Sequence, residues 1–220
     1  MSNKSLLYKL MSSNSKAYQQ LLINKKFIEL IKPLNQKSIV LDIGANIGNV
    51  SNFILEKKGS KVFAFEPNKL CFEILARRFI DDSRVKTFNL AVSNYSGLSK
   101  LYLHQKSKGI TDFNYIESSS IKNEKDNVSE INSIKVNVEH ISKILSKFSY
   151  IDLIKIDAEG SEYEIIPFLI DNKNKIKNVL CELHGNPQYS KNKEFYDDYQ
   201  NLLTSLKKSN LYNNWFYEWY

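Results

Sequence analysis

From residue 38 onward, short apolar runs alternate with segments in which apolar residues recur every three or four positions. The short runs are typical of buried strands, and the longer spacing is typical of helices. Strands are expected at 38–43, 61–66, 84–90, 135–138, 150–156 and 178–184, and helices at 46–58, 67–80, 140–148, 161–170 and 193–208. This alternation predicts an α/β fold with a mostly parallel central sheet flanked by helices, of the Rossmann-like type.

The segments outside this alternation have different patterns. Residues 1–31 show helical spacing, broken near 12–15 and stopped by Pro33. We therefore expect an N-terminal helical cap at 1–34 and one domain at 35–220. Residues 104–131 are polar with few apolar anchors, so we expect a mobile loop there.

Composition adds little to this picture. The net charge of +7 would suit an acidic partner such as nucleic acid, but the lysines are scattered rather than arranged in a stripe. Cys71 and Cys181 lack metal-binding spacing and are expected to be buried thiols. No signal peptide or membrane-spanning run is recognisable, so a cytoplasmic location is expected.

The turn after the first expected strand has the composition of a ligand-binding loop. Gly44 can adopt a positive φ and lets the backbone approach a ligand. Gly48 is expected to let the following helix pack tightly on the strand. Asp42, at the end of the strand, can accept hydrogen bonds or face the ammonium group of an amino-acid ligand. The turn therefore predicts a nucleotide-type site at the carboxyl end of the sheet.

Glu66 ends the second expected strand, about 20 residues after this loop. An acidic side chain in that position can accept hydrogen bonds from both hydroxyls of a ribose. The dinucleotide fingerprint G-x-G-x-x-G is absent, since the loop from Gly44 is G-A-N-I-G. S-adenosylmethionine (SAM), which has no phosphate, suits this loop better than NAD.

Four segments, in this order, resemble the motifs of FkbM-type methyltransferases: 41–48, 63–67, 89–93 with Gly97, and 151–162. The resemblance spans about 38–185 and implies a class I methyltransferase fold that transfers the methyl group of SAM to an oxygen of a small molecule or sugar. By the same resemblance, Ala91 would lie near the adenine. The cofactor contacts implied are Asp42, Gly44, Ala45, Asn46, Gly48, Glu66, Pro67, Ala91 and Asp157.

Polar residues at the ends of two later strands are the catalytic candidates: Lys155, Asp157, Glu182 and His184. Strand alternation places Lys155 and Asp157 on one face, and Glu182 and His184 on one face. We expect His184 to take the proton of the acceptor hydroxyl because its usual pKa lies near neutrality, with Asp157 as the other candidate. Asp157 could instead cap the next helix.

Asp157, Glu182 and His184 also have the side chains to bind a divalent ion that activates the acceptor. The sequence favours catalysis without a metal over this variant. The aromatic tail 211–220 is too short for the usual closing pair of strands, so we expect that pair to be shortened or missing. The tail is expected to close the core, with an edge strand, a homodimer contact or a sugar-stacking surface as alternatives.

Three functions remain open at this point. A small-molecule or saccharide O-methyltransferase is favoured, with the loop at 104–131 closing over the acceptor. A methyltransferase acting on an RNA ribose is the second possibility, supported by the basic charge. A non-catalytic binding module ranks last, because Gly44, Gly48 and Glu66 are all present.

Overall fold

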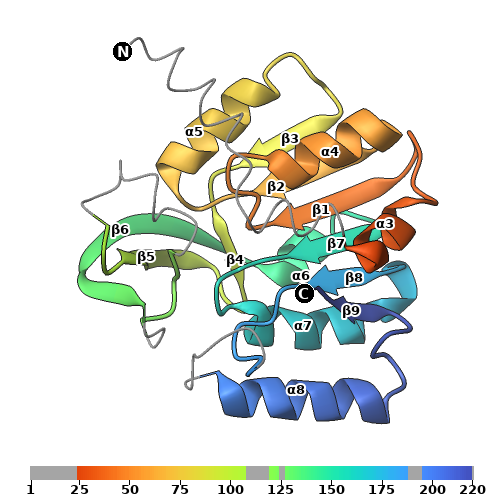
Figure 1. Ribbon diagram of the computed structural model, residues 1–220. Helices are drawn as coiled ribbons and strands as arrows, with labels where there is room; N and C mark the ends of the chain where they lie inside the picture. The colour runs from red at the N-terminus through yellow and green to blue at the C-terminus, as the bar shows by residue number, and fades with distance from the viewer. Residues whose placement is uncertain (1–23, 108–118, 124–126, 188–194, 220) are drawn as a thin grey trace.

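Six parallel strands form the central sheet of the computed structural model (Figure 1), which describes residues 24–107, 119–123, 127–187 and 195–219. The strand order is β3-β2-β1-β7-β8-β9. Their bounds are β1 Ile39–Ile43, β2 Lys61–Phe65, β3 Val85–Phe88, β7 Leu153–Ile156, β8 Val179–Cys181 and β9 Phe216–Glu218. Every neighbouring pair is parallel. The predicted α/β, Rossmann-like fold is confirmed.

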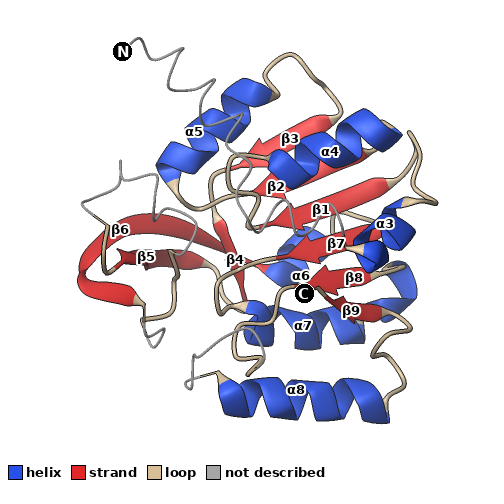
Figure 2. Ribbon diagram, in the orientation of Figure 1, coloured by secondary structure: helices blue, strands red, loops and turns tan. Residues whose placement is uncertain are grey.

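Helices cover both faces of this sheet (Figure 2). The helices are α3 Lys25–Ile31, α4 Asn49–Lys58, α5 Lys69–Arg78, α6 Ile141–Leu145, α7 Glu162–Asp171 and α8 Tyr196–Lys208, with a short 3-10 helix at Lys173–Lys175. Val40 packs in a cluster with α3, α4 and α5, whereas its neighbour Leu41 packs in a cluster with α6, α7 and α8. Strand alternation therefore sends successive side chains into two separate cores.

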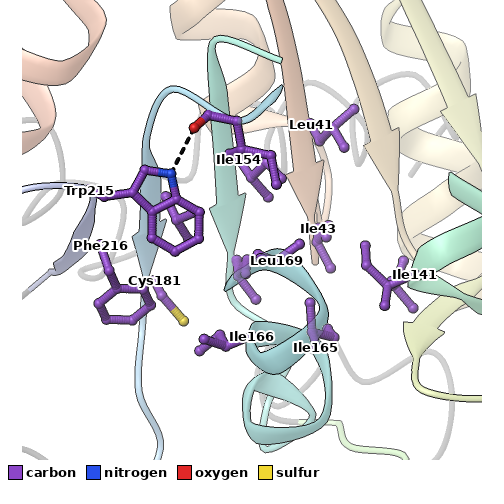
Figure 3. Close-up of a cluster of buried hydrophobic side chains, with 14 of the residues drawn as sticks. Leu41, Ile43, Ile141, Ile154, Ile165, Ile166, Leu169, Cys181, Trp215 and Phe216 are labelled. Carbon is purple, nitrogen blue, oxygen red and sulfur yellow. Dashed lines mark hydrogen bonds between the residues drawn. The ribbon is translucent and has the colours of Figure 1, made fainter. Parts of the chain in front are cut away.

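The C-terminal tail closes the second of these cores, as expected from its aromatic residues (Figure 3). Phe216 is fully buried, and Trp215 donates a hydrogen bond from Nε1 to the carbonyl of Ile176 at 2.7 Å. The tail also forms β9, which pairs in parallel with β8. Of the usual closing strand pair, the described residues contain one short edge strand, β9.

The helix starts differ from the sequence expectation because the preceding turns are longer. Helix α4 begins at Asn49 rather than residue 46, since Gly48 precedes it in the left-handed conformation. Helix α5 begins at Lys69 rather than at Pro67, because the side chain of Asn68 caps it by accepting from the amide of Leu70. Gly59 ends α4 in the left-handed conformation, as glycine commonly does after the last turn of a helix.

A second, three-stranded sheet lies beside the main sheet, at the left of Figure 1. Its order is β4-β6-β5, with bounds β4 Ala91–Ser93, β5 Gly97–His104 and β6 Val128–His140. The sequence analysis expected only one short strand at 135–138 in this region. The expectation of a loop over 104–131 is wrong at its two ends, which belong to β5 and β6, and residues 108–118 and 124–126 lie outside the described residues.

The predicted N-terminal cap is described only in its last part. Residues 1–23 lie outside the described residues, while Phe27 and Ile31 of α3 are buried against the sheet. Among the helices that the structure describes, none has the length and apolar character needed to cross a membrane.

Candidate active site

The sheet has a topological switch point between β1 and β7. From β1 the chain continues outward through β2 and β3, and from β7 it continues in the opposite direction through β8 and β9. The two strands are adjacent, and the amide of Asp157 donates to the carbonyl of Ile43 at 3.0 Å just beyond their ends. In open parallel sheets ligands bind at this point, outside the carboxyl ends of the strands.

The glycine loop after β1 is packed directly on the end of β7. Gly44 has a φ of 73°, and a Cβ atom built on it would lie 1.7 Å from the carbonyl oxygen of Asp157. Gly48 has a φ of 83°, and its Cβ would collide with side chains of Leu75 and Phe79. Gly48 therefore permits close approach of α5, which corrects the expectation that it packs on the strand.

Replacing Gly44 with alanine is expected to destabilise the fold by about 2–3 kcal/mol, from left-handed strain and forced displacement of the loop. Urea unfolding measures this loss. Gly59→Ala is the matched control, because φ is 65° and the nearest atom is the flexible side chain of Gln36 at 3.1 Å. Equal losses in the two variants would show that the contact with Asp157 is unimportant.

Glu66 joins the glycine loop to the end of β2. One carboxylate oxygen accepts from the amide of Asn46 at 2.8 Å, and the other accepts from the amide of Asn68 at 2.7 Å. Burial raises the pKa of this carboxyl to about 7, although both amide hydrogen bonds oppose the rise. Asn46 itself has a φ of 51°, which is uncommon for a residue with a side chain.

Three further residues expected to contact the cofactor, Ala45, Pro67 and Ala91, follow the ends of β1, β2 and β3. Ala45 is buried, and its amide donates to the carbonyl of Phe65 at 3.0 Å. The side-chain amide of Asn89 donates to the carbonyls of Glu66 and Pro67, at 2.9 and 3.0 Å. Ala91 is buried at the start of β4. The hydrogen bonds of Asn89 therefore connect the loop after β3 to the loop after β2 at this edge of the sheet.

Asp42 and Lys155 form a buried ion pair beneath the loop. They are register partners on β1 and β7, and Lys155 Nζ lies 3.3 Å from Asp42 Oδ1. Ser51 Oγ donates to Asp42 at 2.6 Å, and Lys155 donates to the carbonyl of Gly44 at 2.8 Å. Burial lowers the pKa of Lys155, but the charges of Asp42 and Asp157 outweigh this and raise it overall.

Both members of this pair are buried. Asp42 is fully buried and Lys155 is 3% exposed, and the contacts expected of them with the cofactor and the acceptor stay predictions. Lys155 holds the carbonyl of Gly44 and lies 3.6 Å from Asp157 Oδ2. These contacts fix the position of the loop relative to Asp157, whose side chain is 29% exposed.

His184 lies at the centre of a cluster of carboxylates beyond β7 and β8. Its Nδ1 is 3.0 Å from Glu162 Oε1, and its Nε2 is 3.0 Å from Glu159 Oε2. Glu182 Oε1 lies 4.0 Å from Nε2. Ligand atoms of Asp157, Glu182 and His184 lie within 4.8 Å of one another. The structure therefore brings together three of the four residues predicted to be catalytic.

Two acids of this cluster have opposite pKa shifts. Burial raises the pKa of Glu182 to about 8, and the negative charge of Asp157 adds to that rise. Burial also acts to raise the pKa of Glu162, but the charge and hydrogen bond of His184 outweigh it, so this pKa is lowered. Glu162 is therefore held as a carboxylate against the imidazole, while Glu182 has a less favourable environment for its charge.

Glu162 was not among the site residues selected from sequence. Glu162 is fully buried and accepts from the amides of Ala158 and Gly160, at 3.0 and 2.9 Å. Glu159 has a φ of 52°, a strained conformation that often marks a functional turn. The D-A-E-G-S-E stretch that resembles the family motif contained both acids, but their spacing alone did not indicate that they flank His184.

A short segment that pairs with β5 through a bridge between Ser120 and Tyr102 also reaches this cluster. Ser120 Oγ donates to the carbonyl of Glu159 at 2.5 Å, and Lys122 forms an ion pair with Glu164. Tyr163 of α7 donates from its hydroxyl to the carbonyl of His184. These contacts hold the strand ends in place from two sides.

A parallel sheet of this order, with a glycine loop after β1 and an acid at the end of β2, is Rossmann-like and is suited to a nucleotide-type ligand at its switch point. The chain belongs to the FkbM methyltransferase family, since the family model described as "Methyltransferase FkbM domain" matches residues 42–212. Methyltransferase activity and membership of this family were both predicted from the four motifs.

Individual relatives agree on methyl transfer. "Methyltransferase sdnD" of Sordaria araneosa is 27% identical over 177 residues, covering 69% of this chain and 68% of that protein. "Probable ribosomal RNA small subunit methyltransferase A" of Methanococcoides burtonii is 31% identical over 118 residues, covering 44% of this chain and 43% of that protein. The RNA methyltransferase candidate PH1948 of Pyrococcus horikoshii superposes with a TM-score of 0.40 at 14% identity, covering 90% of this chain and 81% of that one. That superposition is too weak to bear on function.

Proposed function

We propose that this methyltransferase uses SAM to methylate a hydroxyl of a small molecule or saccharide. The observation that carries the proposal is the position of the His184 cluster. It lies at the ends of β7 and β8, directly beside the switch point where Gly44 contacts Asp157. A group that receives the proton of a hydroxyl is thus next to the site where a cofactor would bind.

The residues around the glycine loop fit SAM. The carboxylate of Glu66 is suited to ribose hydroxyls, and the partly exposed carboxylate of Asp157 is suited to a positively charged group. The loop contributes backbone groups at Gly44, Ala45 and Asn46 without bulky side chains. SAM would supply the activated methyl group on its sulfonium, and the protein's contribution is binding and orientation.

The acceptor hydroxyl must lose its proton as it is methylated. Both ring nitrogens of His184 face carboxylates at 3.0 Å, an arrangement that favours a doubly protonated imidazole. A doubly protonated ring has no lone pair for another proton. We therefore assign proton uptake to the carboxylates that surround His184, rather than to its ring as the sequence suggested.

The direct test is a methyl-transfer assay with labelled SAM and a panel of glycans, nucleotide sugars, hydroxylated small molecules and ribosomal RNA. Label in an alkali-stable ether of a glycan or small molecule would support the proposal. Label in RNA alone would favour the second candidate, which the relative named for ribosomal RNA methylation and the net charge of +7 both support. Binding to RNA should then weaken steeply with salt.

Glu66 gives cofactor binding a specific pH dependence. Only its ionised form can accept hydrogen bonds from both ribose hydroxyls, and its pKa lies at about 7 before the ligand binds. Affinity for S-adenosylhomocysteine should therefore rise with pH and level off above the pKa of Glu66. At one pH unit below that pKa, the affinity should be about tenfold lower than on the plateau.

Calorimetry at a series of pH values measures this dependence. Glu66→Gln should bind more weakly, with little change between pH 6 and 8. Glu56→Gln, an exposed acid that accepts from Asn52 on α4, should retain the wild-type profile. A wild-type affinity that does not vary over this range would be inconsistent with ribose binding by Glu66.

A further inference from the structure

The charges of the His184 cluster do not balance. Glu159 and Glu162 contact the imidazole at 3.0 Å, Glu182 lies 4.0 Å from it, and Asp157 completes the group. Even when His184 is protonated, one imidazole faces several acidic groups, and the nearby Lys155 is shared with the fully buried Asp42. Acidic side chains gathered this closely favour a bound cation.

Three side chains in the cluster have the geometry of an ion site. Asp157, Glu182 and His184 each offer one ligand atom, and these atoms lie within 4.8 Å of one another. Three ligands around an ion at about 2.2 Å lie within about 4.4 Å of one another. Small side-chain rotations would therefore bring these atoms to coordination distance.

The buried carboxylate of Glu162 gives independent support, because it sets the direction of the imidazole. Its Oε1 lies 3.0 Å from His184 Nδ1, and two backbone amides hold it in place. Donation from Nδ1 leaves Nε2 facing Glu159 at 3.0 Å and Glu182 at 4.0 Å, so an ion bound at Nε2 would displace the contact with Glu159. A carboxylate behind a histidine is the usual support of a metal-binding imidazole.

Glu182 has a free coordinating group. Its side chain accepts no hydrogen bond from any residue in the part of the chain that the structure describes. It lies 4.0 Å from His184 and within 4.8 Å of a carboxylate oxygen of Asp157. A carboxylate that is mostly buried and not hydrogen-bonded is costly unless a ligand completes its environment.

We propose that Asp157, Glu182 and His184 bind a divalent cation. Two carboxylates and one imidazole suit Mn²⁺ or Mg²⁺, and the ion takes the place of the proton on Nε2. Three protein ligands leave open positions on a six-coordinate ion. This part of the inference rests on the proposed function: the open positions take two neighbouring oxygens of the acceptor, as in a vicinal diol. The ion then lowers the pKa of the hydroxyl to be methylated.

Binding of Mn²⁺ to chelator-treated protein, followed by electron paramagnetic resonance, tests the site without measuring activity. Wild-type protein should bind one ion per chain. Glu182→Gln and Asp157→Asn should each weaken binding at least ~10-fold, about 1.4 kcal/mol. Glu29→Gln, whose side chain is 66% exposed on α3, is the matched control and should bind as wild type does. Thermal unfolding of each variant establishes that it is folded.

Failure of the ion site and failure of the proposed function give different results. Folded wild-type protein that binds no Mn²⁺, or Glu182→Gln that binds it as tightly as wild type, overturns the ion site. Calorimetry with S-adenosylhomocysteine tests the cofactor separately, so protein that binds Mn²⁺ but no cofactor retains the ion site and loses the proposed function. Methyl transfer to a diol should stop with chelator and return with Mn²⁺, and transfer that continues in chelator overturns the role of the ion.

Discussion

Replacing His184 with asparagine should lower kcat by about 10²–10⁴-fold while leaving affinity for the cofactor within about twofold of wild type. The imidazole lies between Glu159 and Glu162 and beside Glu182. Its loss removes the contacts that hold these carboxylates in position to accept the proton of the acceptor hydroxyl. The cofactor loop is held separately, by Glu66 and by the Lys155 contact with Gly44. Single-turnover methyl transfer, with calorimetry for the cofactor, separates these two effects.

His140→Asn is the matched control for this variant. His140 caps α6 by accepting at Nδ1 from the amide of Ser142, at 3.0 Å, and asparagine is itself a good helix cap. Its activity should be unchanged. If His184→Asn retained wild-type kcat, the assignment of this cluster to the acceptor would have to be abandoned.

Replacing Lys155 with methionine should lower the free energy of unfolding by about 3–5 kcal/mol at neutral pH, because it leaves Asp42 buried without its cation. The pKa of Lys155 is raised, so the side chain is charged at neutral pH. The ion pair therefore contributes fully to the free energy of unfolding below the ordinary lysine pKa, and this contribution is lost only as pH rises through the raised pKa. Loss of the hydrogen bond to Gly44 should also weaken cofactor binding.

Urea unfolding of Lys155→Met and of Lys143→Met compares a buried pair with an exposed one. Lys143 is 63% exposed and pairs with Glu139 at 3.1 Å, so its loss should cost under about 1 kcal/mol. Adding Asp42→Asn to Lys155→Met should recover part of the lost stability. Equal losses at the two lysines would show that the Asp42–Lys155 pair is not important for the fold.

The cofactor side of the site follows closely from the sequence because its determinants are local. Gly44 and Gly48 lie in one turn, and both have positive φ. Glu66 ends the next strand and reaches back to the amide of Asn46. The register of neighbouring parallel strands then brings these parts together whatever the rest of the chain does.

The acceptor side could be predicted only in part, because its contacts depend on register and tertiary packing. Residue spacing placed Lys155 at a strand end, but its burial follows from its pairing with Asp42 across two strands. Glu162 is the first residue of α7 and meets His184 only after β8 packs beside β7. The second sheet was mostly missed because β5 and the first half of β6 alternate weakly between apolar and polar residues, whereas the alternating second half of β6 was expected as a strand.

Calorimetric titration of folded wild-type protein with S-adenosylhomocysteine is the most direct test of the cofactor site at the switch point between β1 and β7. The account predicts one molecule bound per chain, with affinity reduced at least ~10-fold in Gly44→Ala and little changed in Gly59→Ala. Absence of binding to folded wild-type protein, or identical affinity in both glycine variants, would contradict it.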